Sequence, residues 1–189
     1  LDASLGQARN NGYLAVKTGA IFQYTGGGSE TTSRTLWLDN GASTFDISNA
    51  SGALTWNGGG TRSQAFTKTG AGTLTMGGAF SSGAAVTVNG GTLVLSTANS
   101  HTGTTTVNSG ATLRISNDNQ LGSGVINLRG TSGSPASVNV TASTSSDNIF
   151  DAVGSGYRGS FNVDSGQTFT VSAAGGLRAY SGSSGFAKT

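Results

Sequence analysis

The chain has 189 residues, of which 34% are hydrophobic and 10% are charged, with a formal net charge of +2 and no cysteine. This composition excludes a disulfide scaffold and thiol catalysis, and no apolar run approaches the ~20 residues of a membrane helix. The few Lys and Arg are scattered singly, which argues against nucleic-acid binding.

Apolar residues recur two apart between residues 36 and 171, which places each pair on one face of a strand and sends the residue between them outward. In chain order the pairs predict strands at 36–38, 45–47, 74–76, 86–88, 93–95, 113–115, 126–128, 138–140, 161–163 and 169–171. Trp56 lies two after Leu54 and is expected in the core. Trp37, beside Arg34, is expected to point outward, where residues 1–28 cover it or it stacks on a sugar or another chain.

The strands belong to a repeated motif with a sharp corner in its middle. It reads VTVNGGTLVLS at 86–96, TTVNSGATLRIS at 105–116 and FNVDSGQTFTVS at 161–172, with degenerate copies LWLDNGASTFDIS at 36–48 and KTGAGTLTM at 68–76. The corners are Asn40-Gly41, Asn89-Gly90, 108–110 and 164–166, residue types that tolerate left-handed backbone angles. Val88 and Val107 are 19 apart, and Leu93 and Leu113 are 20 apart.

This spacing predicts an all-β, right-handed parallel β-helix, a β-solenoid with about 20 residues per coil. Roughly nine coils would then form a rod on the order of 40 Å long. The main alternative is an antiparallel sandwich or meander, because Asn-Gly is also a strong hairpin signal.

Three regions are expected along the rod. Residues 1–33 form partly degenerate coils or a cap, residues 34–172 form the β-helix repeats, most regular over 66–130, and residues 173–189 form a Gly/Ser-rich end. Lys17-Thr18-Gly19-Ala20 repeats at residues 68–71, and Phe186-Ala187-Lys188-Thr189 matches residues 66–69. This match predicts that the chain stops inside a further repeat, and the expected partners are further repeats of the same protein or other copies end to end.

The run from Phe66 to Leu128 resembles the autotransporter-associated β-strand repeat, also called the passenger-associated transport repeat. Residues 68–78 carry its KTGxGTLTLSG element, residues 98–113 its NTYTGxTTVNxGTL element with His101 in place of Tyr, and residues 120–128 its ALGSGxVxL element. The resemblance implies a right-handed parallel β-helix on the outside of a bacterium, in a passenger domain or a large repetitive surface protein.

No catalytic, cofactor-binding or metal-binding residue is predicted. His101 is the sole histidine and is expected to be a surface turn residue rather than part of a triad. Asp39 with Asp46, and Asp147 with Asp151, are the carboxylate pairs weighed for polysaccharide cleavage. Asp118, between Asn117 and Asn119, is the best calcium candidate but offers too few ligands.

The sequence therefore favours a noncatalytic extracellular structural solenoid, as an adhesin or passenger stalk segment or as a stacking fibre subunit. A carbohydrate-binding or polysaccharide-cleaving β-helix is the alternative, and an ice-binding solenoid a minor one. For ice binding, the expected outward column of Thr44, Thr73, Thr92, Thr112 and Thr168 has a neighbouring column interrupted by Asp46 and Arg114. Partners would include a host-surface protein or glycan, with no nucleic acid and no membrane insertion by this segment.

Overall fold

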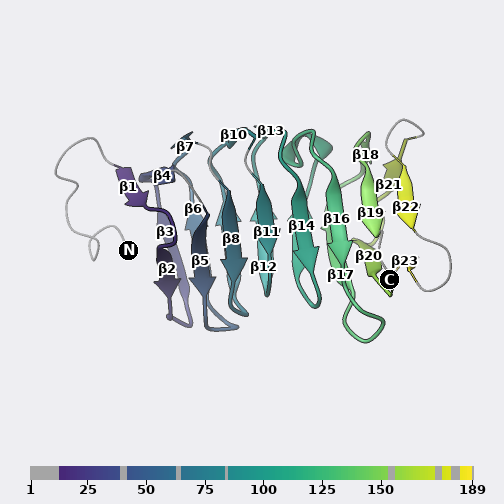
Figure 1. Cartoon of the computed structure of the whole chain (residues 1–189), viewed down its shortest axis with the longest axis horizontal. Coiled ribbons are helices and arrows are strands. Elements are labelled where there is room, and N and C mark those ends of the chain that lie inside the picture. The colour runs from purple at the N-terminus through teal and green to yellow at the C-terminus, as the bar shows by residue number, and fades with distance from the viewer. Residues whose placement is uncertain are drawn as a thin grey trace.

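The computed structural model describes residues 13–38, 42–62, 65–83, 85–152, 156–172, 176–179 and 184–188. In this part of the chain, short strands follow one another around a rod and return to the same face once per coil (Figure 1). Eight successive coils each contribute one element to the third face and one strand to each of two long sheets, so about seven turns separate the first coil from the last. The fold is thus a β-solenoid.

The strands of each face line up along the rod in chain order. Sheet one contains β2 (Ile21–Tyr24), β5 (Ser43–Ile47), β8 (Phe66–Thr69), β11 (Val86–Val88), β14 (Thr105–Asn108), β16 (Ile126–Arg129), β19 (Phe150–Ala152) and β22 (Leu177–Ala179). Sheet two contains β3 (Ser29–Thr32), β6 (Ala53–Trp56), β9 (Thr73–Met76), β12 (Thr92–Leu95), β15 (Thr112–Ile115), β17 (Ala136–Val140), β20 (Arg158–Val163) and β23 (Gly185–Lys188).

The third face is less regular. It begins with a three-stranded sheet of β1 (Tyr13–Val16), β4 (Thr35–Leu38) and β7 (Gly60–Arg62) and continues as β10 (Ser81–Ser82), β13 (Ser100–His101), the 3₁₀ turn η1 (Asp118–Gln120), β18 (Thr144–Ser146) and β21 (Phe169–Val171). Strand pairing is therefore interrupted on one side of the rod and continuous on the other two.

Neighbouring coils pair in parallel, so the antiparallel alternative is wrong for the named strands. Thr73 pairs with Thr92 and Thr92 with Thr112, so the central coils have the length that the sequence spacing predicts. The next coil, from Thr112 to Ser137, is longer because a turn at Thr131–Ser134 widens it. Because the outer coils are longer, the described residues form eight coils rather than nine, and the seven steps between them at ~4.8 Å give roughly 34 Å.

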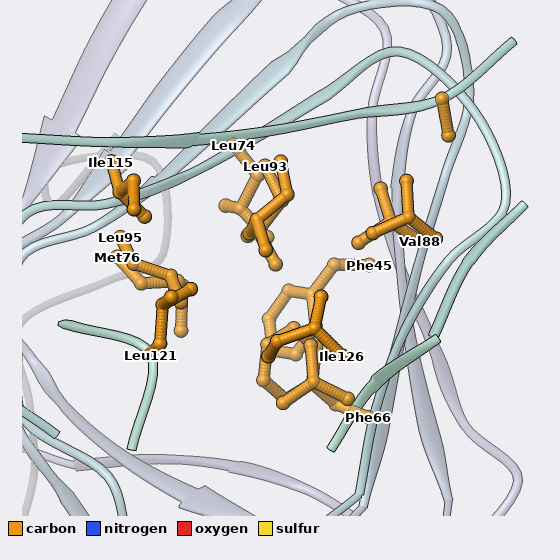
Figure 2. Packing of buried hydrophobic residues seen from close by; sticks show 14 of the residues in the cluster. Phe45, Phe66, Leu74, Met76, Val88, Leu93, Leu95, Ile115, Leu121 and Ile126 are labelled. Carbon is orange, nitrogen blue, oxygen red and sulfur yellow. The ribbon is translucent and has the colours of Figure 1, made fainter. Parts of the chain in front are cut away.

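The inward residues form a continuous apolar spine. Figure 2 shows Leu74 stacked on Leu93, and Met76 on Leu95, with Leu121 of the third face opposite. These inward pairs of sheet two are confirmed, because each residue is at most 1% exposed: Leu54, Trp56, Leu74, Met76, Leu93, Leu95, Leu113, Ile115, Val138 and Val140. In the predicted pair Phe161/Val163, Phe161 is 9% exposed and Val163 is partly buried. Aromatic rings fill the two outer parts of the spine, where Phe45 packs edge-on against Phe66, and Phe150 against Phe161.

The sequence copies are not all structurally equivalent. Residues 86–96 and 105–116 do occupy the same corner, from sheet one to sheet two. In FNVDSGQTFTVS, however, Phe161 lies in sheet two and Phe169 on the third face, and in LWLDNGASTFDIS Leu36 lies on the third face and Phe45 in sheet one. The two copies are displaced by one face because the same strand–corner–strand pattern suits any corner. The Asn40-Gly41 corner lies outside the described residues.

The same displacement affects the chain ends. Phe186 lies in β23 of sheet two, paired with β20, whereas Phe66 lies in β8 of sheet one. The match between residues 186–189 and 66–69 is therefore one of sequence and not of position. None of the helical segments in the described ranges is long and apolar enough to span a membrane.

Candidate functional site: the corners of the solenoid

Lys68 is a fully buried cation at the corner between the two long sheets. Its side chain follows Phe66 on the inward side of β8, and it is 0% exposed. The ammonium Nζ donates to the carbonyl oxygens of Thr69 at 2.7 Å and Gly70 at 2.9 Å, and to that of Gly90 in the next coil at 3.0 Å. One side chain thus fastens two successive corners.

The three carbonyl oxygens stabilise the charged form of Lys68, which burial destabilises. Desolvation lowers the pKa of Lys68 to about 8, and the nearby Asp46 carboxylate opposes that shift. The ammonium therefore remains the dominant form at neutral pH. No role was predicted for Lys68 from the sequence, although its spacing of two from Phe66 indicates that it faces inward.

We call the hydrogen bonds of Lys68 to two successive corners the lysine clamp. Lys17 shows that the Lys-Thr-Gly-Ala motif alone does not produce such a clamp. It begins the same Lys-Thr-Gly-Ala run, but it lies between the third face and sheet one, and its side chain is exposed. The two lysines have the same local sequence, but Lys17 lies at the corner between the third face and sheet one and Lys68 at the corner between the two long sheets.

We expect Lys68→Met to lower the free energy of unfolding by about 2–3 kcal/mol, because the corner carbonyls lose their charged donor while the apolar stem is retained. The matched substitution Lys17→Met should change the free energy of unfolding by no more than about 0.5 kcal/mol, as is usual for surface positions. Urea unfolding of both variants, followed by circular dichroism, measures the difference. Equal effects of the two changes would contradict the clamp.

His101 is a core residue, which corrects the prediction that it lies at the surface. It is 1% exposed in β13, where Nε2 lies 3.2 Å from the Thr105 hydroxyl and Nδ1 is buried without a hydrogen-bond partner. A Cβ on Gly122 of the next coil would lie 2.8 Å from Nδ1. The ring is thus packed closely between coils, and burial lowers the pKa of His101 below its usual 6.5.

We expect the protein to lose stability as the pH falls below about 6.5. Since the folded-state pKa of His101 lies below the unfolded value, the unfolded chain takes up the proton first, and acid favours unfolding. Urea midpoints measured from pH 7 to pH 5 test this, and the slope should flatten in His101→Gln. The same slope in both proteins would contradict the assignment.

Asparagine side chains hold the third-face corner beside His101. Asn99 accepts from the Phe80 amide at 2.8 Å and donates to the Gln120 carbonyl at 2.7 Å, so it links three successive coils. In the coil after that of Gln120, buried Asn148 donates to the carbonyls of Gly122 and Gly124. The elements resembling NTYTG and ALGSG are therefore neighbouring layers of one corner.

The carboxylates weighed for catalysis occupy separate surroundings. Asp46 accepts from Ser48 and Gln23, both at 2.7 Å, and these hydrogen bonds, with smaller help from Thr69 and Lys68, lower its pKa. Asp39 lies outside the described residues. Asp147 lies in the turn before β19 and accepts a hydrogen bond from the Ser172 hydroxyl. Asp151 lies on the outer side of β19, where Asn127 and Arg178 are its register partners.

The calcium candidate lies at the start of η1. Asp118 is half-buried and its Oδ1 has no hydrogen-bond partner, while Asn117 caps the turn by accepting from the Asn119 amide at 3.1 Å. Within the described ranges, His, Asp and Glu nowhere gather in groups of three or more suited to a metal ion.

The outward threonines form two ladders rather than the single predicted column. In sheet one the register aligns Thr44, Thr67, Thr87 and Thr106, and in sheet two Thr73, Thr92 and Thr112. Beside the second ladder stand Thr55, Thr75, Val94 and Arg114. The break at Val94 and Arg114 limits the flat threonine array to a few coils.

These features define a class: a parallel β-solenoid whose coils are joined by an apolar spine and by polar side chains at the corners. Residues 66–95 and 90–115 match the family model of the passenger-associated transport repeat, which confirms the predicted resemblance. The two matched segments are adjacent, and this similarity to a passenger repeat is consistent with a secreted or cell-surface protein. No curated protein and no solved structure matches the chain.

Proposed function

We propose that this chain is a noncatalytic stalk segment of an autotransporter-type passenger on the bacterial cell surface. The observation that carries the proposal is that the two family repeats fall on the central coils, where the parallel register is unbroken and the coil length nearly constant. A solenoid of this kind gains stability from each neighbouring coil, so its length can vary without a new core. Its role is to hold other parts of the protein away from the cell.

Surface labelling of cells that make the protein tests this role. An antibody against residues 66–128 should label intact cells, and external protease should remove the label. Label that appears only after the cells are permeabilised would contradict the proposal. Release of unsaturated uronates or reducing ends from a panel of polysaccharides would contradict the noncatalytic part, since the stalk is expected to release neither.

End-to-end stacking is a second candidate, favoured by the apolar character of both rod ends. At one end a groove of about 390 Å³ is lined by Phe161, Val163, Phe169, Val171 and Leu177, among others, and Leu177 is 49% exposed. At the other end Phe22 in β2 faces inward in register with Phe45 but is only partly buried. Because β2 and β22 are the outermost strands of sheet one, a second copy could continue the parallel ladder.

Sedimentation velocity over a range of concentrations tests the stacking. We expect elongated multimers that disappear in Phe22→Asp and equally in Leu177→Asp, because each change places a charge on the inward side of a terminal strand, where the second copy would pack. Arg114→Asp, on an exposed mid-rod position, should leave them intact. A monomer at every concentration would contradict stacking and leave the stalk proposal standing.

A further inference from the structure

A pair of aromatic rings lies on the outer side of the third face, where strands usually carry polar residues. The rings of Tyr13 and Trp37 have centroids 5.0 Å apart and planes inclined at 48°. Tyr13 is 38% exposed and Trp37 is half-buried. The strand that carries Trp37 already buries Leu36 and Leu38 inward, so the core does not require these two rings.

The rings border a small hollow, which we name the ring pocket. It has a volume of about 170 Å³ and is lined by Tyr13, Ala15, Lys17 and Trp37. Ala15 is the register partner of Trp37, and its small side chain leaves the space beside the indole open. Lys17, two residues after Ala15, completes the lining and brings a cationic side chain to the same hollow.

The combination of inclined rings and one cation defines the chemistry of a ligand. The face of an aromatic ring attracts polarised C–H groups, which line the faces of a pyranose ring, and the ammonium of Lys17 attracts an anion. The inclined rings do not form the parallel plates that would hold a flat nucleobase. We propose that the ring pocket binds an acidic sugar residue, a pyranose that bears a carboxylate.

This inference goes beyond the stalk role, because it gives one end of the rod a glycan-binding site. It also gives a position to the sugar-stacking role weighed for Trp37 from sequence. Arg34, which the sequence places beside Trp37, does not line the pocket, and its backbone carbonyl accepts from the Trp56 indole at 2.6 Å. Lys17 therefore replaces Arg34 as the charged partner.

Tryptophan fluorescence of the full chain provides the test, with tetragalacturonate as the acidic probe and a neutral galactose tetramer as the uncharged one. Trp56 is 0% exposed and supplies a constant background, so a change in emission reports Trp37. We expect tetragalacturonate to change the emission saturably, and the neutral tetramer to bind about tenfold more weakly because it lacks the carboxylates.

Variants identify the site. Lys17→Gln should weaken tetragalacturonate binding by about tenfold, and Tyr13→Ser by a similar factor, whereas Arg114→Gln on the exposed side of sheet two should leave it unchanged. Circular dichroism confirms that each variant is folded. Absence of saturable binding, binding unaffected by Lys17→Gln, or equal binding of oligothymidylate would overturn the proposal.

Discussion

Replacement of Gly91 by alanine should destabilise the protein by about 4 kcal/mol or more, at the upper end for single substitutions. Gly91 has φ +59°, a left-handed conformation that costs other residues about 1–2 kcal/mol. A Cβ there would also lie 2.3 Å from the Gly72 carbonyl oxygen and 2.6 Å from that of Gly70. Both oxygens belong to the backbone of the preceding coil, so relief requires the two coils to separate.

Gly166 provides the matched control. It has φ +76° in a similar turn, at the corner between sheet two and the third face, but no atom lies within 4 Å of the Cβ position. Gly166→Ala should therefore cost only the conformational part, about 1–2 kcal/mol. The difference between the urea midpoints of the two variants measures the destabilisation caused by the steric clash between coils at Gly91. Equal midpoints would contradict such close stacking.

Leu93→Ala should cost about 3–4 kcal/mol, because it opens a cavity in the middle of the spine. Leu93 is 0% exposed and pairs in register with Leu74 on one side and Leu113 on the other. Rigid strands above and below limit the collapse of the neighbours into the space. Denaturant unfolding measures the loss, and the slope of the transition shows whether the two halves of the rod begin to unfold separately.

Val94→Ala, in the same strand, is the control for this change. Val94 points outward and is half-exposed, so its truncation should cost less than about 1 kcal/mol. A larger loss at Val94 than at Leu93 would mean that the strand faces the other way. Because a shift of one residue exchanges the two faces, the pair of variants also tests the register.

The periodicity of the sequence was sufficient to predict the spine. Strict alternation at Leu93/Leu95 and Leu113/Ile115, separated by one coil, leaves a single face on which both pairs can be buried. The number of coils was overestimated because the central spacing was extended to the flanks. Insertions such as Thr131–Ser134 lengthen a coil without changing the strands that precede and follow it.

The roles of the corner residues were harder to predict because the three corners use the same residue types. Lys17 and Lys68 have the same local sequence, and only the identity of the faces they join makes one exposed and the other buried. His101 lies in a polar segment with no apolar partner two residues away. Its burial arises from the coils on either side of it, which no local pattern describes.

The central claim is that the coils lie in register along one axis, and distances between spin labels test it most directly. The chain has no native cysteine, so labels can be placed in pairs at outward positions of sheet two. Thr55 and Asn162 are five strands apart in the register and Thr31 and Asn162 are six. At ~4.8 Å per strand, we expect backbone separations of about 24 Å and 29 Å, with narrow distributions. Broad distributions, or a label at Thr31 that is no further from Asn162 than a label at Thr55, would contradict the solenoid.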